Sequence, residues 1–343
     1  MRQWHSFITA IALMGLSLAG CSQQQRQSQL DTIISRGNVV CGVSGELPGF
    51  SFVGQDGKYS GLDVDVCRAI AAALFDNPDA VEFRNLNAKE RFTAVQTGEV
   101  DVLSRNTTWT MSRDTSVGLE FAPVVFYDGQ GVMVKQNSGI KTLADLKGRS
   151  ICTQTGTTNE QNLADEMRKR NISYTPVVFE DVNIVFATYQ EGRCDAVTSD
   201  RSQLLSRRSA LPKPEEHVIL TDVVSKEPLA PAVAAGDAKW NDAVRWAIYT
   251  LINAEEMGIN SKNVTQLASS SKDPGVRRFL GAEGNLGEGA GLPNDFTVRI
   301  IKHVGNYGEI YDRNLGPQTK LNLPRGQNQL WNQGGLLYAP PFR

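Results

Sequence analysis

The chain has 343 residues, of which 41% are hydrophobic and 21% are charged, and its formal net charge is −2 at pH 7. This length exceeds what one small hydrophobic core usually serves and favours two lobes. The slightly acidic balance argues against a nucleic-acid partner, because nucleic-acid binding requires a basic surface.

The first residues have the pattern of an export signal. A basic residue precedes the apolar run 7–18, which is too short to span a bilayer, since a spanning helix needs about 20 residues. The run ends in Leu18-Ala19-Gly20-Cys21, which resembles a bacterial lipobox, whose cysteine is lipidated and becomes the new N-terminus. We therefore predict a signal peptide at 1–20 and a lipid-anchored flexible tether at 21–35, in a periplasmic, membrane-anchored lipoprotein. The alternative is an ordinary cleaved signal followed by a chance cysteine.

Apolar runs, caps and turn residues predict the elements that follow. In chain order we expect a strand at 39–43, an extended segment at 50–53, an apolar helix ending at 75, a strand at 81–83, an extended segment at 121–134, a short helix at 143–148, a strand at 150–154, a helix at 157–170, a strand at 177–179, an extended segment at 229–235, a helix at 237–257, a loop at 281–291, a helical stretch at 295–313 and an irregular tail at 334–343.

One sequence module occurs twice in the chain. The segment Gln96-Thr97-Gly98-Glu99-Val100-Asp101-Val102 returns as Gln190-Glu191-Gly192-Arg193-Cys194-Asp195-Ala196, at an offset of 94 residues. Each copy follows a residue suited to cap a helix, Asn87 or Asp181, and each has a glycine suited to end one. The repeat therefore predicts a helix, a glycine and a strand in each of two lobes.

The repeat and the extended crossing segments define the predicted architecture. We expect a two-lobed α/β protein in which each lobe is a mostly parallel sheet flanked by helices, and two strands form the hinge. Lobe 1 comprises 36–127 and 237–343, and lobe 2 comprises 128–236. Because ligands lie beyond the carboxyl ends of strands in open α/β sheets, Asn106 and Asp200 should face each other across one cleft.

Four cysteines remain after Cys21, and an even number in an exported chain indicates disulfides. Cys41, Cys67, Cys152 and Cys194 allow three pairings. We favour Cys41–Cys67 and Cys152–Cys194, since each bond then lies within one lobe and leaves lobe closure unrestrained. The alternatives are four buried thiols or a metal site, which is disfavoured because the chain has no Cys-x-x-Cys motif and its three histidines are scattered.

Three predicted features have the chemistry to hold the two charged ends of a zwitterion. Arg113 could bind a carboxylate in a two-pronged geometry, although an exposed arginine is the simpler interpretation of that residue alone. Thr157-Thr158 lies at a predicted helix start, where free N–H groups attract an anion. Asp200 could accept an ammonium group, or could instead cap the next helix.

The chain resembles the extracellular solute-binding proteins of polar amino-acid ABC transporters. The phrases that carry this resemblance are Gly61-Leu62-Asp63-Val64-Asp65, Gly98-Glu99-Val100-Asp101, Gln154-Thr155-Gly156-Thr157-Thr158, Gly192-Arg193-Cys194-Asp195 and the run from Arg105 to Arg113. Further phrases are similar to the general L-amino-acid-binding subgroup, including Cys41-Gly42-Val43-Ser44, Tyr127-Asp128-Gly129-Gln130-Gly131, Asn253-Ala254-Glu255-Glu256, Val304-Gly305-Asn306-Tyr307-Gly308-Glu309 and Tyr338-Ala339-Pro340-Pro341. Together these phrases cover nearly the whole chain.

The resemblance implies a set of ligand-binding residues. Arg113 and the backbone N–H of Thr158 would bind the ligand carboxylate. The carboxylate of Asp200, the hydroxyl of Thr108 and the backbone carbonyl of Asn106 would bind the ligand ammonium group.

The resemblance also bears on the ligand side chain. Leu47 falls where some relatives carry an aromatic ring that covers the side chain, so a stacked pocket for a cationic ligand is not expected. Arg105 is the candidate to meet an acidic or amide side chain, with Glu46 nearby. The alternative role for Arg105 is as partner of an internal carboxylate.

We therefore expect the substrate-binding component of an amino-acid ABC importer, which closes on its ligand by a hinge motion and docks on permease subunits. The expected ligands are glutamate, glutamine, aspartate, asparagine or neutral amino acids, and no metal, cofactor or catalytic residue is expected. Two alternatives remain, a dehydratase-type enzyme on the same fold and a ligand-sensing domain.

Overall fold

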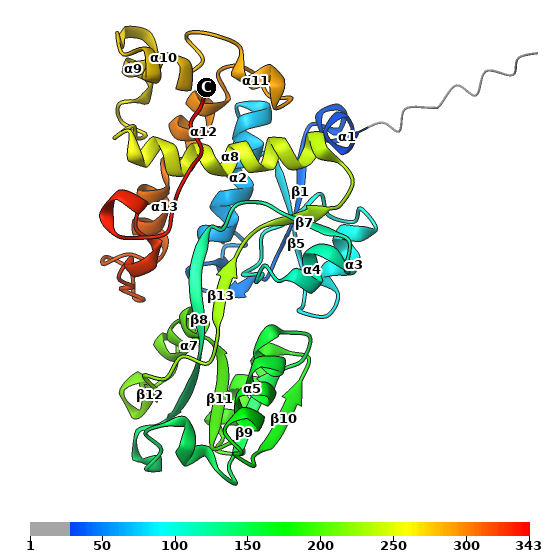
Figure 1. The fold of residues 1–343 in the computed structure, drawn as a ribbon, viewed down its shortest axis with the longest axis vertical. Coiled ribbons are helices and arrows are strands. Elements are labelled where there is room, and N and C mark those ends of the chain that lie inside the picture. Colours follow the sequence, from blue (N-terminus) through cyan, green and yellow to red (C-terminus); the bar gives the residue numbers. More distant parts are fainter. Residues whose placement is uncertain (1–27) are drawn as a thin grey trace, which may run out of the picture.

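Two β-sheets, one in each lobe, organise residues 28–343, which are the residues that the computed structural model describes (Figure 1). The predicted signal peptide and the lipidated Cys21 lie outside this described range. Lobe 1 is the upper part of Figure 1, which holds both ends of the described chain, and lobe 2 is the lower, green part.

The sheet of lobe 1 has the strand order β5-β1-β6-β14-β7. β1 runs parallel to β5 and β6, whereas β14 is antiparallel to β6 and β7. The strands of this sheet are β1 (Val39–Val43), β5 (Val81–Asn85), β6 (Val102–Leu103), β7 (Leu119–Phe121) and β14 (Ala232–Ala234). A small antiparallel sheet beside it contains β2 (Glu46–Leu47), β3 (Ser51–Val53) and β4 (Tyr59–Ser60).

The sheet of lobe 2 has the order β10-β9-β11-β8-β12, with β13 also paired to β8. β9 runs parallel to β10 and β11, and the pairs made by β8 are antiparallel. The strands are β8 (Phe126–Lys135), β9 (Ser150–Gln154), β10 (Thr175–Phe179), β11 (Ala196–Asp200), β12 (His217–Ile219) and β13 (Lys226–Leu229). The expected parallel arrangement therefore holds for three neighbouring strands in each lobe, whereas the first strand that enters each sheet after a crossing, β8 or β14, is antiparallel to its neighbours.

Helices cover both faces of each sheet, and buried side chains fill the layers between them. In lobe 1, α3 packs on one face, while α2, α8 and α12 pack together on the other. The helices of lobe 1 before the crossing are α1 (Gln29–Arg36), α2 (Leu62–Phe75), α3 (Arg91–Gln96) and α4 (Met111–Thr115). The helices of lobe 2 are α5 (Thr158–Lys169), α6 (Val182–Gln190) and α7 (Arg201–Ser209), with 3₁₀ turns at Gln136–Ser138, Leu143–Leu146 and Pro214–Glu216.

Two antiparallel strands, β8 and β13, run between the lobes (Figure 1). Phe126 of β8 pairs with Leu229 of β13, and Gly129 pairs with Lys226. The returning chain enters the lobe 1 sheet at once as β14, because Ala232 pairs with Leu103 and with Phe121. The predicted end of lobe 2 at residue 236 is therefore wrong, since the chain has left lobe 2 before residue 232.

The repeated module folds as a helix, a glycine and a strand in both lobes, as α3 and β6 in lobe 1 and as α6 and β11 in lobe 2. Asp181 caps α6 as predicted, because its carboxylate accepts hydrogen bonds from the backbone N–H groups of Asn183 and Ile184. Asn87 instead forms a tight turn with the N–H groups of Lys89 and Glu90, and α3 begins only at Arg91.

Residues 29–35 do not form the flexible tether that we predicted, because they fold into α1, which packs on lobe 1. Ser28 caps this helix, and the side chains of Leu30 and Ile33 are only 2% and 0% exposed. The backbone N–H of Gln29 donates to the carboxylate of Asp237, which also caps α8. Leu30 and Ile33 lie at helical spacing, so α1 buries one apolar face against lobe 1.

The C-terminal portion packs on lobe 1 as expected, but it is more helical than predicted. Its elements are α8 (Ala238–Glu256), α9 (Val264–Ser270), α10 (Pro274–Phe279), α11 (Leu286–Gly289), α12 (Phe296–Val304), α13 (Tyr307–Asn314) and two 3₁₀ turns at Gly326–Asn328 and Trp331–Gln333. The expected helix at 295–313 is interrupted, because Gly305 adopts a positive φ of 85° and Asn306 starts a new helix with a capping box to Glu309.

The structure contains both disulfides that the lobe assignment favours. Cys41 is bonded to Cys67 within lobe 1, with the Cα atoms 6.3 Å apart. Cys152 is bonded to Cys194 within lobe 2, with the Cα atoms 5.8 Å apart. Neither bond links the lobes. Across residues 28–343, every helix is too short or too polar to cross a membrane.

Candidate functional site

A small cavity lies between the lobes, and we call it the inner cavity. It encloses about 20 Å³, which is room for about one water molecule. Its lining comes from both lobes and consists of Arg91, Arg105, Asn106, Thr108, Gln154, Thr157, Thr158, Asn159, Asp200 and Gln203. Five of the eight predicted ligand residues are therefore brought to one place, including Asn106 and Asp200 from the two copies of the repeat.

Asp200 supplies the negative group of the inner cavity. It ends β11 and is buried, and its carboxylate accepts a hydrogen bond of 2.9 Å from the side-chain amide of Asn159. Burial raises the pKa of Asp200 well above its usual range, and the nearby carboxylates of Asp128 and Glu227 raise it further. A cationic group bound here would favour the ionised form of Asp200.

Arg113 lies beside the inner cavity but not in its lining. It belongs to α4, which Thr110 caps, and its guanidinium is buried over the ring of Phe92 at 5.0 Å. Its Nη1 donates a hydrogen bond of 2.9 Å to the backbone carbonyl of Thr108, a residue that does line the cavity. Burial lowers the pKa of Arg113, so an anion placed beside it would stabilise its charge.

Arg91 is a cavity residue that the sequence analysis missed. It is the first residue of α3 and is 3% exposed, its Nη1 lies 3.4 Å from the hydroxyl of Thr107, and its Nε has no hydrogen-bond partner. Burial lowers the pKa of Arg91 strongly, and the charges of Arg105 and Arg113 lower it further. The position of Arg91 at the start of a short helix was the only signal available, and it gave no reason to expect burial.

Asn106 is held in place by a second buried carboxylate. Its φ is +33°, and its N–H donates a hydrogen bond of 3.0 Å to Asp63 in the first turn of α2. Burial raises the pKa of Asp63 to about 6. This contact fixes the backbone of the loop that carries the predicted ammonium ligands.

Arg105 connects the inner cavity to a larger one, which we call the outer chamber. The outer chamber has a volume of about 320 Å³ and is lined by Ser44, Glu46, Asn85, Leu86, Asn87, Arg105, Gln154, Glu180, Asp181 and Val182. The Nε of Arg105 donates to the backbone carbonyl of Leu86 at 2.7 Å, and the carboxylates of Asp63 and Glu46 oppose the lowering of its pKa by burial.

The other two predicted side-chain residues have different surroundings. Glu46 lines the outer chamber, and its carboxylate lies 4.0 Å from the guanidinium of Arg207 in lobe 2. Leu47 lines neither cavity, because its side chain is buried in the hydrophobic core of lobe 1.

The seam between the lobes is closed around the inner cavity. The hydroxyls of Thr108 in lobe 1 and Thr158 in lobe 2 are 3.4 Å apart. Both donate to the carboxylate of Glu227 on β13, a residue that the sequence analysis also missed. At the rim, the hydroxyl of Ser206 in lobe 2 donates to the backbone carbonyl of Pro48 in lobe 1 at 2.9 Å.

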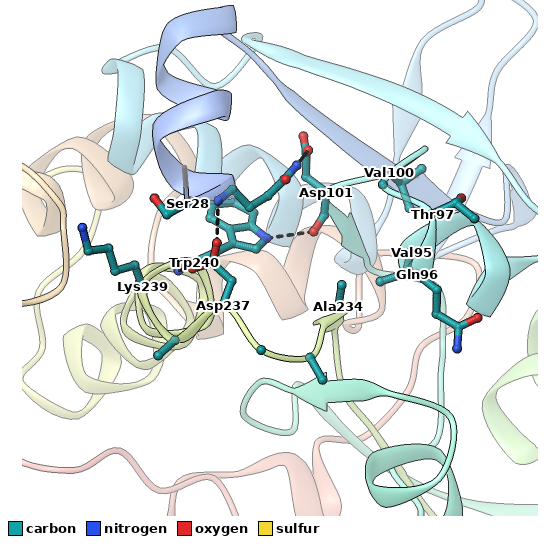
Figure 2. A pocket seen from close by; sticks show the side chains of 15 residues that line it. Ser28, Val95, Gln96, Thr97, Val100, Asp101, Ala234, Asp237, Lys239 and Trp240 are labelled. Carbon is teal, nitrogen blue, oxygen red and sulfur yellow. Dashed lines mark hydrogen bonds between the residues drawn. The ribbon is translucent and has the colours of Figure 1, made fainter. Parts of the chain in front are cut away.

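A pocket of about 520 Å³ beneath α1 is separate from this seam (Figure 2). None of the predicted ligand residues lines it. Its carboxylates are occupied by other contacts, because Asp237 binds the backbone N–H groups of Gln29 and Trp240, and Asp101 binds the side chains of Gln29 and Arg36. The buried charges that could hold a zwitterion therefore gather at the seam, and not in this pocket.

Comparison with known proteins identifies similar chains. The model of the family "Bacterial extracellular solute-binding proteins, family 3" matches residues 39–263. The chain is 48% identical to the general L-amino acid-binding periplasmic protein AapJ of Rhizobium johnstonii, over 97% of this chain and 96% of that one. It is 46% identical to the glutamate/glutamine/aspartate/asparagine-binding protein BztA of Rhodobacter capsulatus, over 98% and 99% of the two chains.

A solved structure extends the similarity to the whole described fold. A periplasmic binding protein of an ABC transporter from Brucella ovis, with glutathione bound, has a TM-score of 0.89 and is 50% identical in sequence. The match covers 92% of this chain and 99% of that chain, so it includes the C-terminal portion that lies beyond the family model.

Proposed function

This chain belongs to the bacterial extracellular solute-binding proteins of family 3, and from that premise we propose that it is the amino-acid-binding component of an ABC importer. The observation that carries the proposal is the inner cavity, where a buried acid of one lobe faces buried guanidinium groups of the other. Opposite buried charges on two lobes suit a zwitterion, because each end of the ligand would neutralise one of them.

The α-carboxylate and α-ammonium groups of the ligand are assigned to the predicted residues. Arg113 binds the carboxylate once its guanidinium leaves the carbonyl of Thr108, and the N–H of Thr158, in the first turn of α5, adds a second donor. Asp200, the hydroxyl of Thr108 and the carbonyl of Asn106 accept the three ammonium hydrogens.

The side chain of the ligand is assigned to Arg91 and Arg105. Both guanidinium groups are buried and line the inner cavity, and the Nε of Arg91 has no hydrogen-bond partner. A side-chain carboxylate or amide oxygen would accept hydrogen bonds from them, which favours glutamate, glutamine, aspartate and asparagine. A lysine or arginine ligand would place a third positive charge beside these two and should bind weakly.

Binding requires the lobes to open, because the closed inner cavity has room for about one water molecule. The strands β8 and β13 are the hinge of this motion, and ligand contacts to Arg113 and Asp200 then hold the lobes together. We propose that the ligand-bound, closed form is the one that docks on the permease.

Glutathione is a second candidate ligand, for two reasons. The similar Brucella ovis protein has glutathione bound, and the outer chamber of about 320 Å³ adjoins the inner cavity through Arg105 and Gln154. The γ-glutamyl end would occupy the inner cavity, and the rest of the tripeptide would extend into the outer chamber.

We further propose that Cys21 carries a lipid anchor that holds the protein on the periplasmic face of a membrane. The support is the Leu18-Ala19-Gly20-Cys21 sequence. Expression of the Cys21→Ser variant tests this proposal. The variant should appear in the soluble periplasmic fraction, whereas the wild type should remain with the membrane; equal distribution of the two would reject the anchor.

Calorimetry on ligand-stripped protein tests the amino-acid proposal, with glutamate, glutamine, asparagine, alanine, lysine and glutathione as the panel. We expect binding of the acidic and amide ligands, and a loss of at least about thirtyfold in Arg113→Ala, because truncating one partner of a buried charge pair costs 2 kcal/mol or more. Arg84→Ala, at an exposed position of β5, is the matched control. Absence of binding by any ligand, or equal binding by Arg113→Ala, contradicts the proposal.

Binding without turnover separates this function from the dehydratase alternative. The similar curated proteins are named as binding proteins. We expect each bound amino acid to be recovered unchanged after long incubation with the protein. Conversion of a ligand by the wild type, with none by Asp200→Asn, would favour the enzyme.

A further inference from the structure

Glu227 is a buried carboxylate on the hinge. It lies on β13 and pairs with Asp128 of β8. These two strands connect the lobes (Figure 1). The exposed fraction of Glu227 is 0%. Within residues 28–343, no salt bridge includes Glu227. Burial of an ionised carboxylate without a cationic partner costs free energy, so other groups must stabilise this one.

Neutral donors surround both oxygens of Glu227. Oε2 accepts the hydroxyl hydrogens of Thr108 at 2.6 Å and of Thr158 at 2.8 Å. Oε1 accepts from the side-chain amide of Asn162 at 2.8 Å and from the hydroxyl of Ser225. The carboxylate therefore joins Thr108 of lobe 1 to Thr158 of lobe 2, and both of these threonines line the inner cavity.

A hydroxyl has one hydrogen to donate and two lone pairs with which to accept. When the hydrogens of Thr108 and Thr158 are given to Glu227, each oxygen can only accept from any further group. An ammonium ion has hydrogen atoms to donate and no lone pair, so either oxygen suits it, and the assignment above uses the oxygen of Thr108. A carboxylate or an amide carbonyl oxygen would find no donor in them.

Charge strengthens this preference. Glu227 and Asp200 are buried, and the charge of Glu227 raises the pKa of Asp200, which disfavours a second negative charge there. A cation bound beside Asp200 would relieve that repulsion. The charge of Glu227 also acts on Arg113, where it opposes the lowering of the pKa by burial.

On the basis of the amino-acid-binding function proposed above, we propose that Glu227 is a positioning residue for the ligand ammonium group. It acts through Thr108, whose hydroxyl it makes an acceptor, and through its negative charge. Removal of the charge should weaken binding of ligands that have an α-ammonium group and spare ligands that lack it.

A ligand-by-variant cycle tests this proposal. The variant is Glu227→Gln, and the ligands are L-glutamine and glutaramate, which is the same molecule without the amino group. In competition calorimetry we expect Glu227→Gln to lose at least about tenfold in affinity for L-glutamine and less than about threefold for glutaramate. Glu99→Gln, at an exposed position after α3, is the matched control and should change neither affinity.

Equal losses for the two ligands would show that Glu227 only supports the fold, and an unchanged affinity for L-glutamine would also overturn the proposal. Failure of the wild type to bind any amino acid would instead contradict the proposed function. If Glu227→Gln does not fold, Thr108→Val provides the same comparison, since it removes the hydroxyl through which Glu227 acts. Its loss should again be confined to L-glutamine, and Thr108→Ser should restore it; equal losses for both ligands would reject the role.

Discussion

Lys89 of lobe 1 and Glu180 of lobe 2 form an ion pair across the seam, with 2.6 Å between Nζ and Oε1. It lies at the edge of the outer chamber, which Glu180 lines. The pair is formed only when the lobes are closed, so it reports on closure. The two side chains are 66% and 60% exposed, so solvent screens their attraction and the pair contributes little free energy to closure of the lobes.

Replacement of this rim pair should have little effect on ligand affinity. We expect Lys89→Ala and Glu180→Ala each to weaken amino-acid binding by less than about threefold at physiological salt, since exposed ion pairs are screened. Calorimetry at low and high salt checks this, and the small loss should disappear as salt rises. A tenfold loss that persists at high salt would mean that the rim, and not the buried charges, holds the lobes together.

Ligand affinity should fall as the solution becomes acidic. Burial and the nearby carboxylates raise the pKa of Asp200, so lowering the pH protonates Asp200 in the free protein and removes the acceptor for the ligand ammonium group. The pKa of Asp128, raised to about 6, adds a second group that titrates in this range. Affinity for L-glutamine should therefore decrease as the pH falls through about 6, with proton release on binding at the acid end.

Glutamine is the suitable probe for this experiment because its own charges do not change over this range. Calorimetry in buffers of different ionisation enthalpy measures the proton release. Asp200→Asn should bind weakly, with a flatter dependence on pH. An affinity that is constant or rises towards pH 5 in the wild type contradicts the role assigned to Asp200.

The disulfide of lobe 2 should contribute to stability without contributing to specificity. Conversion of Cys152 and Cys194 to alanine should lower the free energy of unfolding by about 2–4 kcal/mol, because the unfolded chain regains the freedom of the closed loop. Chemical denaturation measures the loss. The ratio of affinities for L-glutamine and L-alanine should stay unchanged, since the bond lies within one lobe; a changed ratio would show that it shapes the site.

The C-terminal portion should stabilise the hinge through Asn328. Its side-chain oxygen accepts from the N–H of Tyr127 on β8 at 2.6 Å, and its side-chain NH₂ donates to the carbonyl of the same residue at 3.1 Å. Asn328→Ala leaves these backbone groups without partners and should lower the free energy of unfolding by about 1–3 kcal/mol. The neighbouring, exposed Gln327→Ala is the control, and equal stability of the two variants in thermal denaturation would refute this role.

Local sequence patterns were sufficient for much of the fold. The strand at 39–43 and the helix that ends at Phe75 have the predicted bounds, because short apolar runs and their flanking turn residues are local signals. The repeated module located both lobes, and it also placed Asn106 and Asp200 in one cavity. The lobe assignment then selected one cysteine pairing of the three, and the structure contains it.

The sequence by itself determined the lobes, the repeated module and the loop that carries Asn106 and Thr108, whereas the tertiary structure alone decided which charges are buried together. Arg91 and Glu227 have no local pattern that marks them. Glu227 meets Thr108 across 119 positions of the chain, because the hinge strand returns between the two lobes. Closure of the two lobes decides which charges lie together, since a charged side chain becomes part of a buried site only when distant segments exclude water from around it.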